Sequence, residues 1–323
     1  MRAMQIRELG GPEKLEAVEL PDPEPGPGQV SVDVAAIGCN FADTLICRGK
    51  YQLRPELPFS PGSEVAGRIR ALGAGVSGLV PGQRVMAQLG YGGYATVALA
   101  DARRVHAIPD ALSFEQAAAF GVAHQTSYLA LVDRAALQPG ETLLVHAAAG
   151  GVGLSAVQLG HALGARVIAI AGNDDKLALA RRHGADEGLL SGTPDWHQEV
   201  QKLTGGRGAD VIYDSVGGET TQLSTKCIAW GGRLLVIGFS SGEIPSLALN
   251  RVMLKHIAVM GVNLGGYHEH QPERLRDAME QLFSLHTRGV APEIGGRYPL
   301  ERAADALAEL AARRTTGKLV LLP

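Results

Sequence analysis

The sequence predicts an α/β protein of two domains, one mostly β and one built on a doubly wound parallel sheet. The chain has 323 residues, whereas one domain usually holds about 100–200. Residues 1–110 contain short strand-like runs separated by turns, and from Glu141 onward strand-like and helix-like runs alternate. Such alternation is typical of βαβ units and therefore of a parallel sheet.

The first 110 residues carry the signals of strands and turns. Gln29–Ile37 alternates apolar and polar residues, as a half-buried strand does, and follows the Pro- and Gly-rich segment Pro21–Gly28. Val65–Leu72 is a second strand-like run. The pattern changes near Ser113, because this serine is a helix N-cap signal that precedes a run of helix-forming residues.

The rest of the chain can be divided into elements by its apolar runs and their boundaries. We expect strands at Thr142–His146, Arg166–Ala171, Asp210–Asp214, Arg233–Gly238 and Leu319–Leu322. We expect helices at Val152–Leu163, Asp174–His183, Pro272–His286 and Leu300–Ala312.

Composition restricts the class of function. The formal net charge is -3 and the pI is about 6.4, which does not favour binding to nucleic acid or to an anionic membrane. The three cysteines show no CxxC spacing, so no disulfide framework is expected. The N-terminal segment lacks the apolar region of a secretory signal, and no apolar run reaches the roughly 18 residues of a spanning helix. We therefore expect a cytoplasmic protein.

The segment Glu141–Leu159 (ETLLVHAAAGGVGLSAVQL) carries the strongest functional signal. An apolar strand runs into a Gly-rich turn and then into a helix, which is the dinucleotide fingerprint with alanine in the first glycine position. The alternative is a Gly-rich turn with no ligand. The backbone at the turn would approach a pyrophosphate, and the N–H groups at the helix start would hold it. The residues assigned to cofactor binding are Ala148, Gly150, Gly151, Val152 and Gly153.

The end of the next strand indicates which cofactor is bound. Enzymes that use NAD place an Asp or Glu there for the ribose hydroxyls. Here the strand ends in Ala171-Gly172-Asn173, which leaves room for a 2′-phosphate, and Lys176 could neutralise that phosphate. We expect NADPH. The alternative is that Asp174 or Asp175 bonds the ribose and that the cofactor is NAD.

With these motifs, the whole chain resembles the quinone oxidoreductase (zeta-crystallin-like) branch of the zinc-free medium-chain dehydrogenase/reductases. GETLLVHAAAGGVGLSAVQLGH is similar to the signature of that branch, with His161 where Lys, Arg or Ser is usual. Pro61–Gly67 (PGSEVAG) is similar to the motif that reads G-H-E in the zinc enzymes. The segment GCNFADTLICRGKY resembles the N-F-x-D-x-x-x-R-x-G-x-Y stretch of the branch through Asn40, Asp43, Gly49 and Tyr51.

The resemblance implies a split architecture. A GroES-like, mostly β catalytic domain would occupy residues 1–118, a Rossmann NADP-binding domain residues 119–260, and a C-terminal return to the catalytic domain residues 261–323. It also implies hydride transfer from NADPH to a quinone or an α,β-unsaturated carbonyl, in a homodimer or homotetramer.

The resemblance also bears on zinc and on the residues that contact substrate. A catalytic zinc needs three protein ligands, but Asn40 and Ser63 stand where the zinc branch has its Cys and His ligands, so we expect no metal. Glu64 is interpreted as a buried acid paired with a neighbour. Asn40 could donate its amide to the substrate oxygen, and Tyr51 could donate a proton or bond the enolate. The alternatives are a turn residue and a pocket wall.

The remaining cofactor contacts are carried over from the family pattern. Lys176 and Arg313 would clasp the 2′-phosphate, and Ser191 stands where relatives have a tyrosine. Thr126 and Asn263 would contact the nicotinamide. Residues at the carboxyl ends of parallel strands, where ligands bind in such sheets, complete the set: Gly172, Asn173, Gly217, Phe239 and Ser240.

Two other functions remain open from the sequence. The same scaffold could reduce the double bond of a 2-alkenal, an enone or an enoyl-CoA (acryloyl-CoA-type) thioester. A non-catalytic, NADPH-binding crystallin-like or RNA-binding protein is the alternative of another class, although the chain has no basic stripe.

Overall fold

The computed structural model describes all 323 residues, and the chain divides into two compact units. The first unit combines Met1–Val122 with Pro292–Pro323, and the second is Ala123–Ala291. The chain thus leaves the first unit within helix α2 (Phe114–Tyr128) and later returns to it. Residues 261–291 lie in the second unit, and the return to the first unit begins at Pro292.

The second unit extends to Ala291 because its last helices pack on α2. In α9 (Pro272–His286), Leu275 and Ala278 form a buried cluster with Leu129, which follows α2 directly. The Gln125 side chain also donates to the Leu275 carbonyl oxygen at 2.7 Å. These contacts are long-range, so the sequence pattern did not indicate them.

A seven-stranded sheet forms the centre of the first unit. Its strand order is β14-β15-β3-β4-β5-β7, with β6 paired to β3, and only β14 and β15 are parallel. The strands are β3 (Gln29–Gly38), β4 (Glu64–Leu72), β5 (Arg84–Gln88), β6 (Val97–Asp101), β7 (Val105–Ala107), β14 (Ile294–Pro299) and β15 (Lys318–Leu322). Outside this sheet lie the paired strands β1 (Arg2–Ile6) and β2 (Leu15–Glu19), and the helices α1 (Phe41–Cys47) and α10 (Ala303–Ala311).

A six-stranded parallel sheet forms the centre of the second unit, in the order β10-β9-β8-β11-β12-β13. This is the order of a doubly wound sheet, whose ligand site lies where the winding reverses, here between β8 and β11. The strands are β8 (Thr142–Val145), β9 (Arg166–Ala171), β10 (Glu187–Leu190), β11 (Ala209–Asp214), β12 (Ile228–Val236) and β13 (Ala258–Gly261). The predicted α/β fold class is confirmed.

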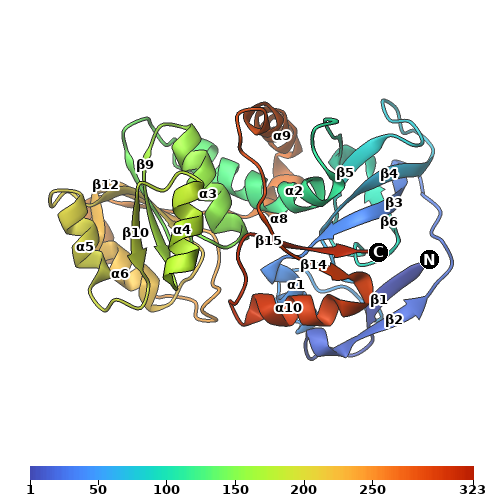
Figure 1. Ribbon diagram of the computed structural model, residues 1–323, viewed down its shortest axis with the longest axis horizontal. Helices are drawn as coiled ribbons and strands as arrows, with labels where there is room; N and C mark the ends of the chain where they lie inside the picture. The colour runs from blue at the N-terminus through green and yellow to red at the C-terminus, as the bar shows by residue number, and fades with distance from the viewer. The chain divides into compact units, whose positions relative to one another are not determined.

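Helices cover both faces of this sheet. Figure 1 shows α3 and α4 on one face and α5 and α6 on the other. The fully buried side chains of Leu143, Leu144 and Val145 explain why β8 is a continuous apolar run. The helices are α3 (Gly151–Ala162), α4 (Asp174–Arg182), α5 (Trp196–Leu203), α6 (Glu219–Cys227), α7 (Leu249–Lys255) and α8 (Leu264–His270).

Some elements differ from the predicted ones. The strand expected at Arg233–Gly238 begins at Ile228 and ends at Val236. The helix expected at Leu300–Ala312 begins with a 3-10 turn, so that α10 proper starts at Ala303. Helix α1 was not expected at all. No helix of the chain has both the length and the apolar character needed to cross a membrane.

Candidate active site

The turn between β8 and α3 has the geometry of a nucleotide-binding loop. The chain leaves β8 through Ala147, whose φ of 49° is left-handed and rare for a residue with a side chain. The Ala148 N–H donates to the Ile170 carbonyl at 3.0 Å, which fixes the loop to the end of β9. Helix α3 then begins at Gly151, so the first N–H groups of the helix have no partner within it. Such groups bind phosphate oxygens.

The two outer glycines of the loop serve different purposes. A Cβ atom on Gly153 would lie 2.2 Å from the Ala147 carbonyl oxygen, so only glycine fits there. A Cβ atom on Gly150 would meet no atom nearer than that same oxygen, at 3.4 Å. Packing within the protein therefore requires Gly153, whereas the lack of a side chain at Gly150 favours the close approach of a ligand.

The carboxyl ends of β9 and β10 bring four of the predicted residues together. Gly172 and Asn173 follow β9, and the Asn173 side chain accepts a hydrogen bond from the Lys176 N–H at 2.9 Å. Ser191 follows β10, and its N–H donates to the Ala171 carbonyl at 2.8 Å. Partial burial lowers the pKa of Lys176. An anion at this position would counteract that shift, because it stabilises the charged ammonium group.

Gly217, Phe239 and Ser240 lie together beyond β11 and β12. The Ser240 N–H donates to the Ser215 carbonyl at 3.1 Å, and a Cβ atom on Gly217 would lie 2.8 Å from the Phe239 ring. The buried Asp214 carboxylate holds this turn, since its Oδ1 accepts from the N–H groups of Val216 and Gly217 at 2.9 and 3.0 Å. Asp214 was not singled out in the sequence, although it closes a predicted strand.

Asn263 and Thr126 occupy different surroundings. Asn263 is exposed and precedes α8, just beyond the carboxyl end of β13. Thr126 is buried on α2, beside Ser127, whose hydroxyl donates to the Val152 carbonyl at 2.9 Å in the first turn of α3. The Ser127 hydroxyl also lies 2.9 Å from the Tyr213 hydroxyl. This buried serine therefore fixes α2 to the nucleotide loop, a role that no sequence motif indicated.

In the first unit, a buried lysine organises the surroundings of Asn40. Lys318 is the first residue of β15 and is 4% exposed. Its Nζ donates to the Cys39 carbonyl at 2.8 Å, to Asn40 Oδ1 at 2.6 Å and to Glu64 Oε1 at 2.7 Å. All three donors of the ammonium group are thus used within the protein. The expectation that Glu64 is a buried acid paired with a neighbour is confirmed.

The contacts of Asn40 fix the orientation of its amide. Because Lys318 donates to Oδ1, Nδ2 points to Glu64 Oε1 at 3.0 Å and to Ser63 Oγ at 3.2 Å. The bond to Ser63 is the longer one, and Ser63 is half-buried. A substrate oxygen that accepts from this amide would therefore replace the Ser63 contact rather than the Glu64 contact.

Asp43 and Tyr94 form a second buried group, and the half-buried Tyr51 feels the charge of Asp43. One carboxylate oxygen of Asp43 accepts from the Asn40 N–H at 2.8 Å and from the Tyr94 hydroxyl at 3.0 Å, while the other has no partner. Burial raises the pKa of Asp43 to about 6. Burial, and next the Asp43 charge, raise the pKa of Tyr51. The Tyr51 hydroxyl makes no hydrogen bond within the protein and stays protonated at neutral pH, so it can donate to a ligand.

Arg313 belongs to the first unit and Lys176 to the second. Arg313 follows α10 with a left-handed φ of 57°, and the next residue, Arg314, pairs with Glu309 at 2.7 Å.

The donor set near Asn40 does not fit zinc. No group of three or more His, Cys, Asp or Glu side chains lies together in a way that could hold a metal ion. The Lys318 ammonium group bonds directly to Asn40 and Glu64, and its positive charge would repel a divalent cation at this position.

Comparisons with known proteins place the chain in a family. Residues 26–110 match the alcohol dehydrogenase GroES-like domain, and residues 151–284 match the zinc-binding dehydrogenase family. A quinone oxidoreductase of Pseudomonas aeruginosa is 41% identical, over 100% of this chain and 99% of that protein.

Solved structures agree with this assignment. A quinone oxidoreductase of Escherichia coli in complex with NADPH superposes with a TM-score of 0.93 at 35% identity, covering 100% of both chains. A protein described as an NAD-dependent alcohol dehydrogenase superposes with a TM-score of 0.92 at 34% identity, again over 100% of both chains. The chain therefore belongs to the quinone oxidoreductase branch of the medium-chain dehydrogenase/reductases and is an oxidoreductase.

Proposed function

We propose that this oxidoreductase reduces quinones or conjugated carbonyl compounds with NADPH and without a metal ion. The observation that carries the proposal is the Lys318 ammonium group, which is hydrogen-bonded to Asn40 at 2.6 Å where zinc enzymes of the same fold have a cysteine ligand. Oxidation of an alcohol by a zinc enzyme uses the metal as a Lewis acid. Reduction of a conjugated carbonyl can instead rely on hydrogen-bond donors near the oxygen.

NADPH is favoured over NADH by the end of β9. Gly172 and Asn173 carry no acidic side chain. The Lys176 N–H bonds to Asn173 and the Ser191 N–H bonds to Ala171, so a lysine and a serine stand at the same strand end. Asp174 and Asp175 are exposed first-turn residues of α4, a position that the helix dipole favours for acids in any case. The NADPH complex of a similar enzyme supports this choice. Because another similar protein is described as NAD-dependent, the activity must be measured with both NADPH and NADH.

The residues of the first unit would act on the substrate oxygen. NADPH, when bound, supplies a hydride, and negative charge then develops on the oxygen of the acceptor. The Tyr51 hydroxyl, which has no partner in the protein, would donate to that oxygen. Asn40 would donate in exchange for its Ser63 contact, while Lys318 keeps the amide oriented. Protonation of the oxygen completes the two-electron reduction.

We also propose that the protein is a homodimer that pairs through β13. This strand is the edge of the parallel sheet, and edge strands present unpaired N–H and C=O groups. The segment that leads into β13 and the strand itself carry exposed apolar side chains: Ile244, Leu249, Met253, Leu254 and Val259. A second copy related by a two-fold axis would cover both the edge and these side chains.

Steady-state oxidation of NADPH with a panel of acceptors tests the redox proposal. The panel contains a quinone, a 2-alkenal and crotonyl-CoA, each assayed with NADPH and NADH. We expect the quinone to be reduced, at a higher kcat/KM with NADPH than with NADH. Turnover of the thioester alone would assign the enzyme to double-bond reduction of CoA esters. Tight NADPH binding without turnover of any acceptor would overturn the enzymatic proposal and favour a binding protein.

A further inference from the structure

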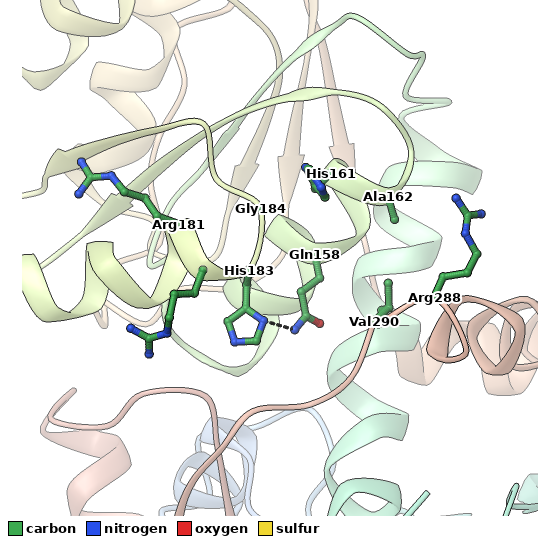
Figure 2. Close-up of a pocket in the computed structure, with 10 residues that line it drawn as sticks. Gln158, His161, Ala162, Arg181, His183, Gly184, Arg288 and Val290 are labelled. Atoms are coloured by element: carbon green, nitrogen blue, oxygen red, sulfur yellow. Dashed lines mark hydrogen bonds between the residues drawn. The ribbon is translucent and has the colours of Figure 1, made fainter. Parts of the chain in front are cut away.

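The second unit contains a pocket of about 530 Å³ at the C-terminal ends of α3 and α4, away from the nucleotide loop (Figure 2). The pocket is formed by the last turns of α3 and α4 and by the segment that follows α9. Its volume is within the range of small-molecule sites. Helix α3 begins at the nucleotide loop and ends at the pocket, and its 12 residues span roughly 18 Å. The pocket is therefore separate from the dinucleotide site.

The lining of the pocket is strongly basic. Arg181, Arg182 and Arg288 line it, together with His161 and His183, and none of the lining residues is acidic. The three arginine side chains are exposed and make no ion pair or hydrogen bond within the protein. Other exposed arginines of this chain do pair, for example Arg302 with Asp305 and Arg314 with Glu309, both at 2.7 Å.

The helix dipoles account for only part of this positive charge. Three helices, α3, α4 and α9, end at the pocket. Each C-terminus carries about half a negative charge, or about 1.5 charges in total. The three arginines carry three permanent positive charges. An excess of positive charge therefore remains among the residues that line the pocket.

The floor of the pocket is fixed by Gln158, which is 5% exposed. Its Nε2 donates to the Ala291 carbonyl at 2.8 Å and to His183 Nδ1 at 2.9 Å. This amide thus ties α3 to the segments that follow α4 and α9. In Figure 2, Arg181 and Arg288 lie on opposite sides of the Gln158–His183 hydrogen bond, and their guanidinium groups are directed away from it. A ligand seated over this bond would contact the two exposed arginines at separate positions, through separate anionic groups.

We propose that this pocket binds a small phosphorylated ligand with two or more anionic groups. The planar guanidinium group of arginine matches phosphate oxygens with two parallel hydrogen bonds, and three arginines allow contacts at several positions. The fixed floor reduces the entropy lost on binding. The pocket does not depend on the redox function proposed above.

Isothermal titration calorimetry with tripolyphosphate, at low salt and on protein saturated with NADPH, tests the proposal. We expect one tripolyphosphate per chain. R181Q/R288Q should weaken this binding by about tenfold or more, because two charge-assisted contacts are lost. R54Q/R276Q is the matched control, since both arginines are exposed and unpaired and lie outside the pocket. It should change the affinity by less than about twofold, the effect of general charge alone.

Three results would overturn the proposal: no binding to the wild type at millimolar tripolyphosphate, equal weakening in the two double variants, or binding that occurs only without NADPH. The last result would mean that the probe enters the cofactor site. NADPH affinity, measured on the same proteins, should be unchanged in both variants. A wild type that binds tripolyphosphate but not NADPH would contradict the redox function and leave the pocket proposal standing.

Discussion

The Nζ atom of Lys318 lies 2.7 Å from Oε1 of Glu64, and both side chains are almost fully buried. The two residues are 254 positions apart in the chain. Glu64 begins β4, Lys318 begins β15, and both strands flank the end of β3 that leads into Asn40. The ion pair therefore joins β15, in the C-terminal return of the chain, to β4 across the end of the strand that precedes the candidate substrate-binding residue.

Replacing Lys318 by Met should destabilise the protein strongly. The substitution leaves the Glu64 carboxylate buried without its counter-ion, and breaking such a pair costs about 3–5 kcal/mol. The double variant E64Q/K318M removes both charges and should recover part of that loss. Urea unfolding of the wild type and the two variants measures these free energies. Equal destabilisation in the single and the double variant would show that the unpaired Glu64 carboxylate is not the cause of the loss.

The raised pKa of Asp43 predicts a pH dependence of stability. The pKa is about 6 in the folded protein and 3.8 in its ordinary state, so the folded state holds the proton more tightly. The stabilisation is therefore complete below pH 3.8 and is lost as the pH rises through 6. D43N stays neutral and does not lose this stabilisation. The free energy of unfolding of D43N minus that of the wild type should therefore be greater at pH 8 than at pH 4.5, by on the order of 2–3 kcal/mol.

Unfolding of D43N and the wild type by urea at both pH values checks this prediction. The difference between the two proteins isolates Asp43 from other titrating groups. A difference that does not change with pH would show that Asp43 titrates normally in the folded protein.

The elements around the nucleotide loop could be predicted because their signals are local. The apolar run of β8, the glycines of the turn and the acidic first turn of α4 lie within short stretches of sequence, and the observed bounds agree with the predicted ones to within a few residues. Ser113 caps α2 as expected, since its hydroxyl accepts from the Gln116 N–H at 3.1 Å. Local backbone chemistry determines each of these features.

The parts that could not be predicted depend on partners that are distant in sequence. Lys318 is the first residue of an apolar strand, a position where a lysine is usually exposed to solvent. Nothing near it in the sequence indicates its partner Glu64. Helix α1 is not predicted, because in the sequence Asn40 is interpreted as a residue that contacts substrate or closes a turn. The actual signal was Asp43, whose carboxylate accepts from the Asn40 N–H at the start of α1.

The two glycines of the nucleotide loop should respond differently to alanine. In G153A, the Cβ atom would meet the Ala147 carbonyl oxygen at 2.2 Å, so we expect destabilisation of about 1–3 kcal/mol and weaker NADPH binding. In G150A the nearest contact is 3.4 Å, so the protein without cofactor should keep its stability. NADPH affinity should still fall by about tenfold, or about 1.4 kcal/mol. Thermal unfolding and NADPH fluorescence titration measure both quantities. Unchanged NADPH affinity in G150A would mean that the ligand does not approach this backbone.

Lys176 should determine the preference between the two cofactors. K176A removes the cation beside Asn173 and Ser191, so NADPH affinity should fall by about tenfold, as expected for one charge-assisted contact. NADH lacks the 2′-phosphate, and its affinity should barely change. K226A, which alters an exposed lysine on α6, is the matched control. Equal losses for NADPH and NADH in K176A would contradict a role in phosphate binding.

The apolar surface beside β13 predicts the oligomeric state. Met253 and Leu254 are each 70% exposed on α7, the helix that precedes the edge strand β13 in the chain. The wild type should therefore have twice the 33.8 kDa mass of one chain in light scattering coupled to size exclusion.

M253E/L254E places charge at the proposed contact, where burial of an unpaired carboxylate is costly, and should shift the protein toward 33.8 kDa. V80E introduces a carboxylate at a side chain of similar exposure, 60%, in the first unit and should leave the dimer intact. A wild type that elutes as a monomer, or a dimer that survives M253E/L254E, would exclude this face as the interface.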